Sequence, residues 1–163
     1  MDGLYQFAPE VGMNICYAKE GTQSLQDVAG VAGRIMKVGN RIRALGSVEY
    51  GASKHIATII LAAMSQDNQL RAAMNIKYRP EIIEGIERTG GFAISSFDRS
   101  AEPKDKSTME WGTIEAIRSL GRVPDLIYDR GGIGKEPMIR ILGKGPSDVV
   151  SKLRRIIGAA DGL

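Results

Sequence analysis

Three residues that could bind an anion stand together at the start of a predicted helix, in the run Ser53-Lys54-His55. Apolar residues then recur at helical spacing (Ile56, Ile59, Ile60 and Ala63), which predicts a deeply buried helix over 54–65. Ser53 is a good N-cap, and the free N–H groups of a helix N-terminus suit phosphate or diphosphate. The positive end of the helix disfavours an imidazolium, so His55 is expected to be neutral. The alternative is a capped core helix whose single histidine merely packs, and these residues alone leave both open.

A second anion-binding candidate is the glycine-rich basic loop that contains Gly131, Gly132, Gly134 and Lys135. Successive glycines let backbone N–H groups turn towards a phosphate, and the lysine adds a positive charge. The loop is not a Walker A motif, because it lacks the four-residue spacer and the Ser or Thr after the lysine. A plain tight turn explains the same residues, so this loop also has two interpretations.

Arg34 follows two glycines and precedes two alternating runs that flank Gly39-Asn40, a pattern that predicts a hairpin over 34–45. The other basic residues of the hairpin are expected to form a solvated face. Asn75 lies within a predicted strand, and Asp98 and Asp129 each end one. Strand ends are common ligand positions in α/β folds, so these three residues are candidates for substrate contact.

The composition fits one domain over residues 1–163, with enough length for a sizeable core. The net charge of +3 comes from 22 basic and 19 acidic residues, too small an excess to indicate nucleic-acid binding. A single cysteine, Cys16, permits no intrachain disulfide and suits a reducing cytoplasm. One histidine and one cysteine exclude the usual zinc clusters. Neither a membrane-spanning run nor a signal peptide is evident.

The elements that must position these residues alternate between strands and helices. The predicted strands are 13–18, 34–38, 41–45, 73–78, 92–97, 124–129 and 138–142. The predicted helices are 24–27, 54–65, 80–88, 108–120 and 147–157. In the helix 108–120, the apolar stripe expected to face the core contains Ile114, Ile117 and Leu120. Interspersed elements with at least one hairpin predict an α/β sandwich with a mixed sheet. Residues 1–12 are turn-rich and are interpreted as a lead-in, as in a domain cut from a longer protein.

Six runs of the chain together resemble the ThiN family of thiamine-phosphate synthases. In order they are DVAGVAGR at 27–34, GASKH at 51–55, AMNIKY at 73–78, SFDR at 96–99, TMEWG at 108–112 and GKEPMIR at 134–140. The resemblance covers almost the whole chain, so it is far more specific than any single motif. It implies a three-layer α/β/α fold like that of class II aldolases of the AraD group.

The resemblance also implies an activity, the joining of hydroxymethylpyrimidine diphosphate to hydroxyethylthiazole phosphate with release of pyrophosphate. It implies that Arg34 and His55 are catalytic, and that a pyrimidine kinase domain precedes this one in archaeal relatives. The family commonly has an arginine where this chain has Lys54, which keeps the charge but lacks the bidentate fork. A carboxylate-bound magnesium ion and a homodimer are compatible with the sequence, although no ligand set is evident and no organic cofactor is expected.

Two other functions are considered. A sensor domain of a transcriptional regulator could bind thiamine phosphates without turnover, but it predicts loss of the Arg34 and His55 residue types. A metal-dependent aldolase on the related fold would need several histidines, and the chain has one.

Overall fold

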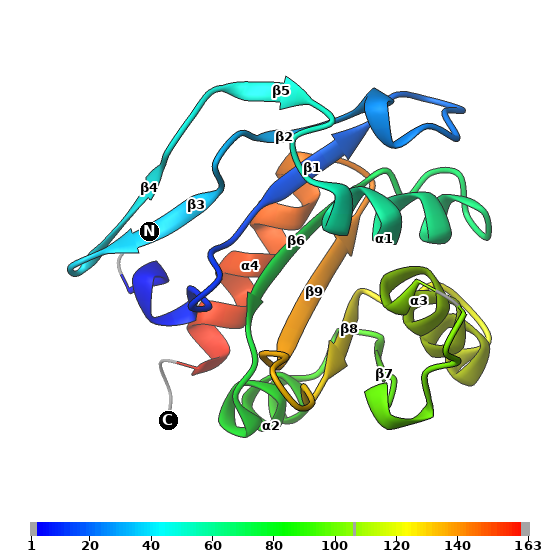
Figure 1. The fold of residues 1–163 in the computed structure, drawn as a ribbon. Coiled ribbons are helices and arrows are strands. Elements are labelled where there is room, and N and C mark those ends of the chain that lie inside the picture. The colour runs from blue at the N-terminus through cyan, green and yellow to red at the C-terminus, as the bar shows by residue number, and fades with distance from the viewer. Residues whose placement is uncertain (1–2, 106, 161–163) are drawn as a thin grey trace.

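A mixed sheet of seven strands forms the centre of the molecule, in the order β5-β2-β1-β6-β9-β8-β7 (Figure 1). The computed structural model describes residues 3–105 and 107–160. The strands of this sheet are β1 (Ile15–Ala18), β2 (Val28–Val31), β5 (Val48–Tyr50), β6 (Ala72–Lys77), β7 (Ile94–Ser96), β8 (Leu126–Asp129) and β9 (Met138–Gly143). Only β7 and β8 are parallel, and every other pair of neighbours is antiparallel.

Helices cover both faces of the sheet. They are α1 (Lys54–Met64), α2 (Pro80–Thr89), α3 (Thr108–Leu120) and α4 (Pro146–Ala160). In Figure 1, α1 and α3 lie on the near face, and α2 and α4 lie behind the strands. Each pair shares a separate apolar core with its face of the sheet. The predicted three-layer α/β/α sandwich is therefore confirmed.

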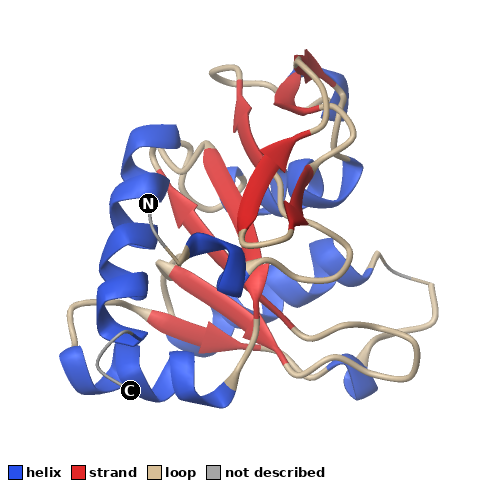
Figure 2. Ribbon diagram, turned by 90° about the vertical axis from the view of Figure 1, so that its left-hand side faces the viewer, coloured by secondary structure: helices blue, strands red, loops and turns tan. Residues whose placement is uncertain are grey.

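The predicted hairpin forms a small sheet of its own, β3 (Ile35–Val38) with β4 (Arg41–Ala44), which extends from the edge of the main sheet (Figures 1 and 2). It is anchored where the backbone of Ile35 exchanges two hydrogen bonds of 2.8 Å with Met13. The hairpin therefore holds Arg34 beside the segment that leads into β1.

Residues 3–12, which the sequence suggested as a lead-in, pack against the domain. Leu4 and Phe7 are buried in the core beneath α2 and α4. Gly12 and Val11 border a cleft described below. The segment contributes both to the core and to the site.

Two strands were missed from the sequence. Residues 28–31 and 48–50 form β2 and β5, although the glycines around the first and the polar residues of the second did not indicate strands. β5 is an edge strand with three exposed residues, so burial imposes no apolar alternation on it. Residues 24–27 contain a short 3-10 helix, and β7 is shorter than the predicted strand 92–97.

The predicted stripe of α3 was wrong at two of its three positions. Ile117 is buried, but Ile114 is half-buried and Leu120 is exposed. The buried face is formed by smaller residues, among them Gly112, Thr113 and Ala116. The reason is close packing: a Cβ atom at Gly112 would lie 2.5 Å from the ring of Phe97. α3 therefore approaches the sheet more closely than a helix with a stripe of isoleucines could.

Among the described residues, no helix combines the length and the apolar character that crossing a membrane requires.

Candidate functional site

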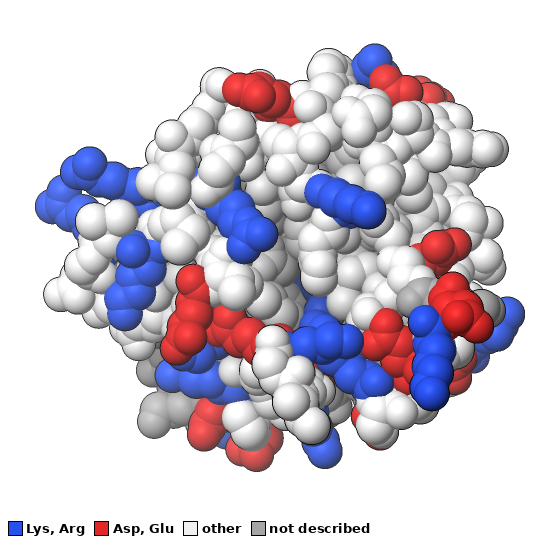
Figure 3. Space-filling view, in the orientation of Figure 1, with Lys and Arg blue, Asp and Glu red and all other residues white. Residues whose placement is uncertain are grey.

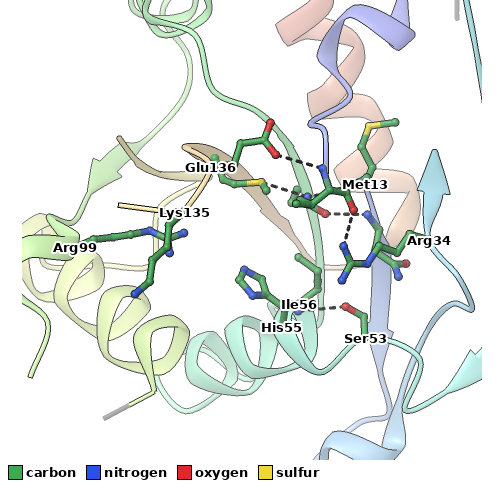
Figure 4. A pocket seen from close by; sticks show the side chains of 14 residues that line it. Met13, Arg34, Ser53, His55, Ile56, Arg99, Lys135 and Glu136 are labelled. Carbon is green, nitrogen blue, oxygen red and sulfur yellow. Dashed lines mark hydrogen bonds between the residues drawn. The ribbon is translucent and has the colours of Figure 1, made fainter. Parts of the chain in front are cut away.

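Two adjoining hollows form one cleft beside the start of α1. The first lobe has a volume of about 260 Å³ and the second about 500 Å³. Five residues border both lobes: Arg34, Ser53, His55, Arg99 and Lys135. In Figure 4, Arg34 and Ser53 lie on one side, Arg99 and Lys135 on the opposite side, and His55 rises from α1 between them. The structure thus brings together Arg34, the α1 start and Lys135, which lie far apart in the sequence.

Arg34 is held in an unusual backbone conformation. Its φ of 72° makes it the single non-glycine residue with positive φ in the described part of the chain, and it follows Gly33 at 70°. An L-residue in this region is strained, and such strain tends to cluster at functional sites. The guanidinium of Arg34 donates a hydrogen bond of 2.5 Å from Nη1 to the carbonyl oxygen of Val11. The exposed side chain is thereby directed along the wall of the cleft (Figure 4).

The start of α1 supplies three consecutive lining residues. Ser53 caps the helix, with its Oγ accepting a hydrogen bond of 3.4 Å from the N–H of Ile56. Lys54 borders the second lobe, whereas Ser53 and His55 border both. The helix end predicted to bind an anion therefore opens into the cleft.

His55 is neutral at physiological pH, as expected from its place at the helix start. Its ring reaches solvent through the cleft, but the surrounding walls remove part of its hydration. That desolvation, together with the positive charges of Arg140, Arg99 and Arg34, lowers the pKa of His55 to about 4, against a smaller opposing effect of Asp129. A neutral imidazole can donate one hydrogen bond and accept another. His55 can therefore orient a polar group of a ligand without adding a charge.

Asp129 is not exposed to a ligand but anchors two arginines. Its carboxylate is fully buried and accepts hydrogen bonds from Arg99 (Nε, 2.6 Å; Nη2, 3.3 Å) and from Nη1 of Arg140. Burial alone would raise the pKa of Asp129, but the two guanidinium groups outweigh it and hold the pKa below its usual value. The sequence suggested that Asp129 contacts a substrate directly. In the structure it lies buried behind the cleft wall, where it holds Arg99 and Arg140.

Asn75 is also engaged by the protein. Its Oδ1 accepts a hydrogen bond of 2.8 Å from the N–H of Asn14, and its Nδ2 donates to the carbonyl oxygen of Gly12 at 3.0 Å. The side chain of Asn14 in turn exchanges two hydrogen bonds of 2.9 Å with the backbone of Val31. These two buried amides fix the backbone of residues 12–14, which forms one wall of the first lobe.

The glycine loop folds as a tight turn. The N–H groups of Gly132 and Lys135 each donate to the other residue's carbonyl oxygen at 3.0 Å, and the N–H of Gly131 donates to Asp129 at 2.8 Å. Gly131 and Gly132 border neither lobe, whereas Gly134 borders the first and Lys135 borders both. The loop thus contributes chiefly a lysine, and much of the expected cradle of backbone N–H groups is already occupied.

Asp98 lies away from the cleft. It is exposed, caps the short 3-10 helix Arg99–Ala101 by accepting a hydrogen bond of 2.8 Å from the N–H of Ser100, and borders neither lobe. Its neighbour Arg99 is the residue that reaches the site. Sequence reasoning missed Arg99 and Arg140, although both belong to runs that carry the family resemblance, SFDR at 96–99 and GKEPMIR at 134–140.

The cleft is lined by more basic than acidic side chains. Its basic side chains are Arg34, Lys54, Arg99 and Lys135. The nearby carboxylates are already paired: Glu136 accepts hydrogen bonds from the backbone of Glu10 and Val11, and Glu102 pairs with Lys135 at 3.2 Å. Figure 3 shows the hollow near the centre of this face, with basic side chains flanking it. The arrangement suits a phosphorylated ligand. The described residues contain no cluster of three or more metal-binding side chains of the His, Cys, Asp or Glu type.

Comparison with solved structures first defines the class of fold. L-fuculose-1-phosphate aldolase from Thermus thermophilus superposes with a TM-score of 0.55 at 10% identity, covering 97% of this chain and 84% of the aldolase chain. An aldolase II superfamily protein from Pseudomonas syringae also has a TM-score of 0.55 at 10% identity, covering 97% of this chain and 68% of its own. At this identity the likeness concerns the fold alone, and it confirms that the chain has a fold like that of class II aldolases.

The family follows from the sequence. A model described as thiamine-phosphate synthase ThiN matches residues 1–155, so the chain belongs to the ThiN family. Thiamine-phosphate synthase ThiN from Methanothermobacter thermautotrophicus is 38% identical over 154 residues, which cover 91% of this chain and 80% of that protein. The bifunctional thiamine biosynthesis protein ThiDN from Methanocaldococcus jannaschii is 48% identical over 155 residues, 93% of this chain. The chain spans 36% of the length of that bifunctional relative.

Two solved structures agree with this assignment. The C-terminal domain of protein MJ0236 has a TM-score of 0.91 and 46% identity, and covers 96% of this chain and 86% of its own. The C-terminal domain of a phosphomethylpyrimidine kinase has a TM-score of 0.89 and 42% identity, and covers 95% of this chain and 89% of its own. Relatives thus occur both as a separate protein and joined to a kinase.

Proposed function

We propose that this chain forms thiamine phosphate from hydroxymethylpyrimidine diphosphate and hydroxyethylthiazole phosphate, with release of pyrophosphate. The observation that carries this proposal is the pair of lobes that meet at shared cationic residues. Two substrates must bind together, one with a diphosphate to lose and the other with a phosphate to hold. The cleft offers two connected volumes with Arg34, Arg99 and Lys135 at their junction.

The lobes differ in chemistry. The first combines apolar side chains, Met13, Ile56 and Met138, with backbone held by Asn14 and Asn75, which suits a flat heteroaromatic ring. The second is lined by Lys54, Ser107 and Thr108 among others, and suits a phosphate group. A reaction between a ring in the first lobe and a phosphorylated partner in the second would occur at their junction.

The reaction needs little proton transfer. The carbon–oxygen bond between the pyrimidine methylene and the diphosphate breaks, and the electron pair leaves with the diphosphate. The ring amine stabilises the resulting cation, and the lone pair of the thiazole nitrogen then forms the new carbon–nitrogen bond. The protein's task is to align the partners and to stabilise the charge of the leaving group.

The residues fit that task as follows. Arg34 binds the leaving diphosphate through charge-assisted hydrogen bonds, since its guanidinium lies at the junction of the lobes. Neutral His55 either donates a hydrogen bond to the diphosphate or orients the pyrimidine amine. Lys135 binds a phosphate oxygen of the thiazole substrate. These roles agree with the expectation, drawn from the family resemblance, that Arg34 and His55 are catalytic.

Magnesium commonly accompanies diphosphate, and a magnesium requirement is therefore part of the expected chemistry. Glu136, which lines the first lobe, and the neighbouring Glu102 are both hydrogen-bonded within the protein, and no cluster of three metal-binding side chains occurs in the described ranges. We assign the leaving-group charge to the basic side chains and derive no step from a metal ion.

The decisive assay incubates the purified chain with both substrates, with and without magnesium, and measures thiamine phosphate and pyrophosphate. We expect equal amounts of the two products, formed about a hundred- to a thousandfold more slowly by Arg34→Ala. A protein that binds thiamine phosphate but never forms it would instead be the sensor domain considered above.

The proposal includes a cytoplasmic location, consistent with one buried, unpaired cysteine. It also includes cooperation with a pyrimidine kinase, either joined to this chain, as the bifunctional relative suggests, or separate. The homodimer suggested from the sequence stays a prediction that sedimentation analysis would test.

A further inference from the structure

Arg99 differs from the other basic residues that border both lobes. Its side chain is 10% exposed, whereas that of Lys135 is 46% exposed and Arg34 is an exposed residue. A long side chain that is already ordered loses less conformational entropy when it binds a ligand. Arg99 is therefore the cleft's pre-organised cation.

The order comes from a buried carboxylate behind Arg99. The carboxylate of Asp129 accepts hydrogen bonds from Nε and Nη2 of the guanidinium. The opposite edge of the guanidinium, which carries Nη1, therefore points away from the carboxylate. Within the part of the chain that the structure describes, no protein acceptor pairs with Nη1. Because the guanidinium is planar, fixing one edge also fixes the direction of the other. That free edge belongs to a residue that lines both lobes, opposite Arg34 (Figure 4).

Asp129 is itself held from several directions. Arg140, whose side chain is 1% exposed, donates to Oδ2, and the N–H of Gly131 donates to Oδ1 at 2.8 Å. Arg140 also lies over the ring of Phe97, 5.4 Å from its centroid. The carboxylate therefore has little freedom to release Arg99 when a ligand arrives.

The charges of this group do not cancel. Arg99 and Arg140 contribute two positive charges against one negative charge of Asp129, in side chains that are at most 10% exposed. Two nitrogens of Arg140, Nε and Nη2, are buried without a hydrogen-bond partner among the described residues. An uncompensated buried charge is unfavourable, and an anion bound next to Arg99 would reduce that cost.

From this arrangement we propose that Arg99 is a phosphate-binding residue of the cleft and that its free edge holds the diphosphate at the junction of the two lobes. Asp129 and Arg140 are positioning residues that act through it. With Arg34 on the opposite wall, the diphosphate is bound between two guanidinium groups. This assignment rests on the proposed function for the identity of the anion, but the binding of pyrophosphate itself can be measured without turnover.

The test is calorimetric titration of the intact chain with pyrophosphate. We expect Arg99→Ala to weaken binding by tenfold or more. Arg41→Ala removes the same charge from the exposed end of the hairpin, outside the cleft, and should change the dissociation constant by less than twofold. Equal dissociation constants for Arg99→Ala and Arg41→Ala would overturn the proposal.

A second variant guards against loss of folding. In Arg99→Ala, Asp129 keeps Arg140 as its partner, and in Arg99→Lys it also keeps a cation at position 99. A lysine that pairs with Asp129 has no fixed second edge, so Arg99→Lys should melt like the wild type and still bind pyrophosphate several-fold more weakly. Wild-type affinity in this folded variant would also overturn the assignment.

The positioning role has its own spectroscopic readout. The NMR signal of the Arg99 Nε–H, assigned by its disappearance in Arg99→Lys, should be protected from solvent exchange in the free protein. Addition of pyrophosphate should shift this signal while it stays protected, because Asp129 keeps its side of the fork. Rapid exchange in the free protein would show that Asp129 does not hold Arg99.

The outcomes separate this proposal from the function on which it rests. Pyrophosphate binding that depends on Arg99 in a protein that never forms thiamine phosphate would refute the synthase and leave the Arg99 assignment standing. If Arg99→Ala forms thiamine phosphate and binds pyrophosphate as the wild type does, the Arg99 assignment is refuted and the synthase proposal stands.

Discussion

The guanidinium of Arg34 donates a hydrogen bond to the carbonyl oxygen of Val11, and this contact joins the hairpin β3–β4 to the segment that precedes β1. Arg34 makes this contact from a backbone conformation that its side chain disfavours, with φ at 72°. The strain and the contact can be separated by substitution.

Arg34→Gly should be more stable than Arg34→Ala, although both lose the same hydrogen bond. Glycine adopts positive φ freely, whereas alanine in the left-handed region costs about 1–2 kcal/mol. For a domain of this size, each kcal/mol corresponds to about 2–4 °C in melting temperature. Thermal unfolding of the two variants measures the difference. A higher melting temperature for Arg34→Ala would mean that the residue leaves the left-handed region in solution.

Arg34 and His55 should act on one transition state, because both border both lobes. Removal of Arg34 is expected to lower turnover by about a hundred- to a thousandfold, and Arg34→Lys should restore little of it. The Arg34→Ala/His55→Ala double variant should be far less impaired than the product of the single effects. Turnover of the four proteins gives the cycle, with circular dichroism as the control for folding. Multiplicative losses would place the two residues at separate sites.

The low pKa of His55, about 4, predicts a particular dependence of stability on pH. The unfolded chain binds a proton at this histidine near its ordinary pKa of about 6.5, while the folded chain does not until lower pH. Neutral His55 therefore favours the folded state above pH 6.5, and this contribution is lost as the pH falls from about 6.5 to about 4. The melting temperature of the wild type should fall more steeply over this range than that of His55→Gln. If the melting temperatures of the two proteins fall in parallel with pH, the pKa of His55 in the folded protein is not lowered.

Ile60 and Ile133 offer a matched pair of isoleucines in opposite environments. Ile60 is 1% exposed in the core between α1 and the sheet, whereas Ile133 is fully exposed at the tip of the glycine loop. Ile60→Asp should unfold the protein, because an unpaired buried charge costs several kcal/mol. Ile133→Asp should leave the melting temperature nearly unchanged. Denaturant unfolding of both variants tests whether α1 is buried as described. Equal stability of the two would contradict it.

Part of this site could be read from the sequence because its signals are local. Ser53 as a cap, the apolar spacing after His55 and the Gly39-Asn40 turn each depend on a few adjacent residues, and each was confirmed in α1 and the hairpin. The role of the glycine loop was only partly recognised, because the sequence does not reveal that the N–H groups of Gly132 and Lys135 donate to carbonyl oxygens within the loop.

The remaining features depend on pairings between distant segments. Arg140 stands within the otherwise apolar strand β9, where an arginine is expected to face solvent. Helices on both faces of the sheet bury it instead. Asp129, with which Arg140 pairs, comes from β8. Arg99, the other arginine that pairs with Asp129, comes from the connection after β7. No local pattern links these three residues, and only the strand order of the sheet brings them together.

The basic residues of the cleft come from four separate parts of the chain: the hairpin, the start of α1, the connection after β7 and the turn between β8 and β9. An anion bound by all of them acts as a reversible cross-link between these parts. It binds the folded chain alone, so at a hundred times its dissociation constant it would add about 2.7 kcal/mol to the free energy of unfolding. A cell rich in the substrate would thus hold a more heat-resistant and protease-resistant form of the same polypeptide than a starved one.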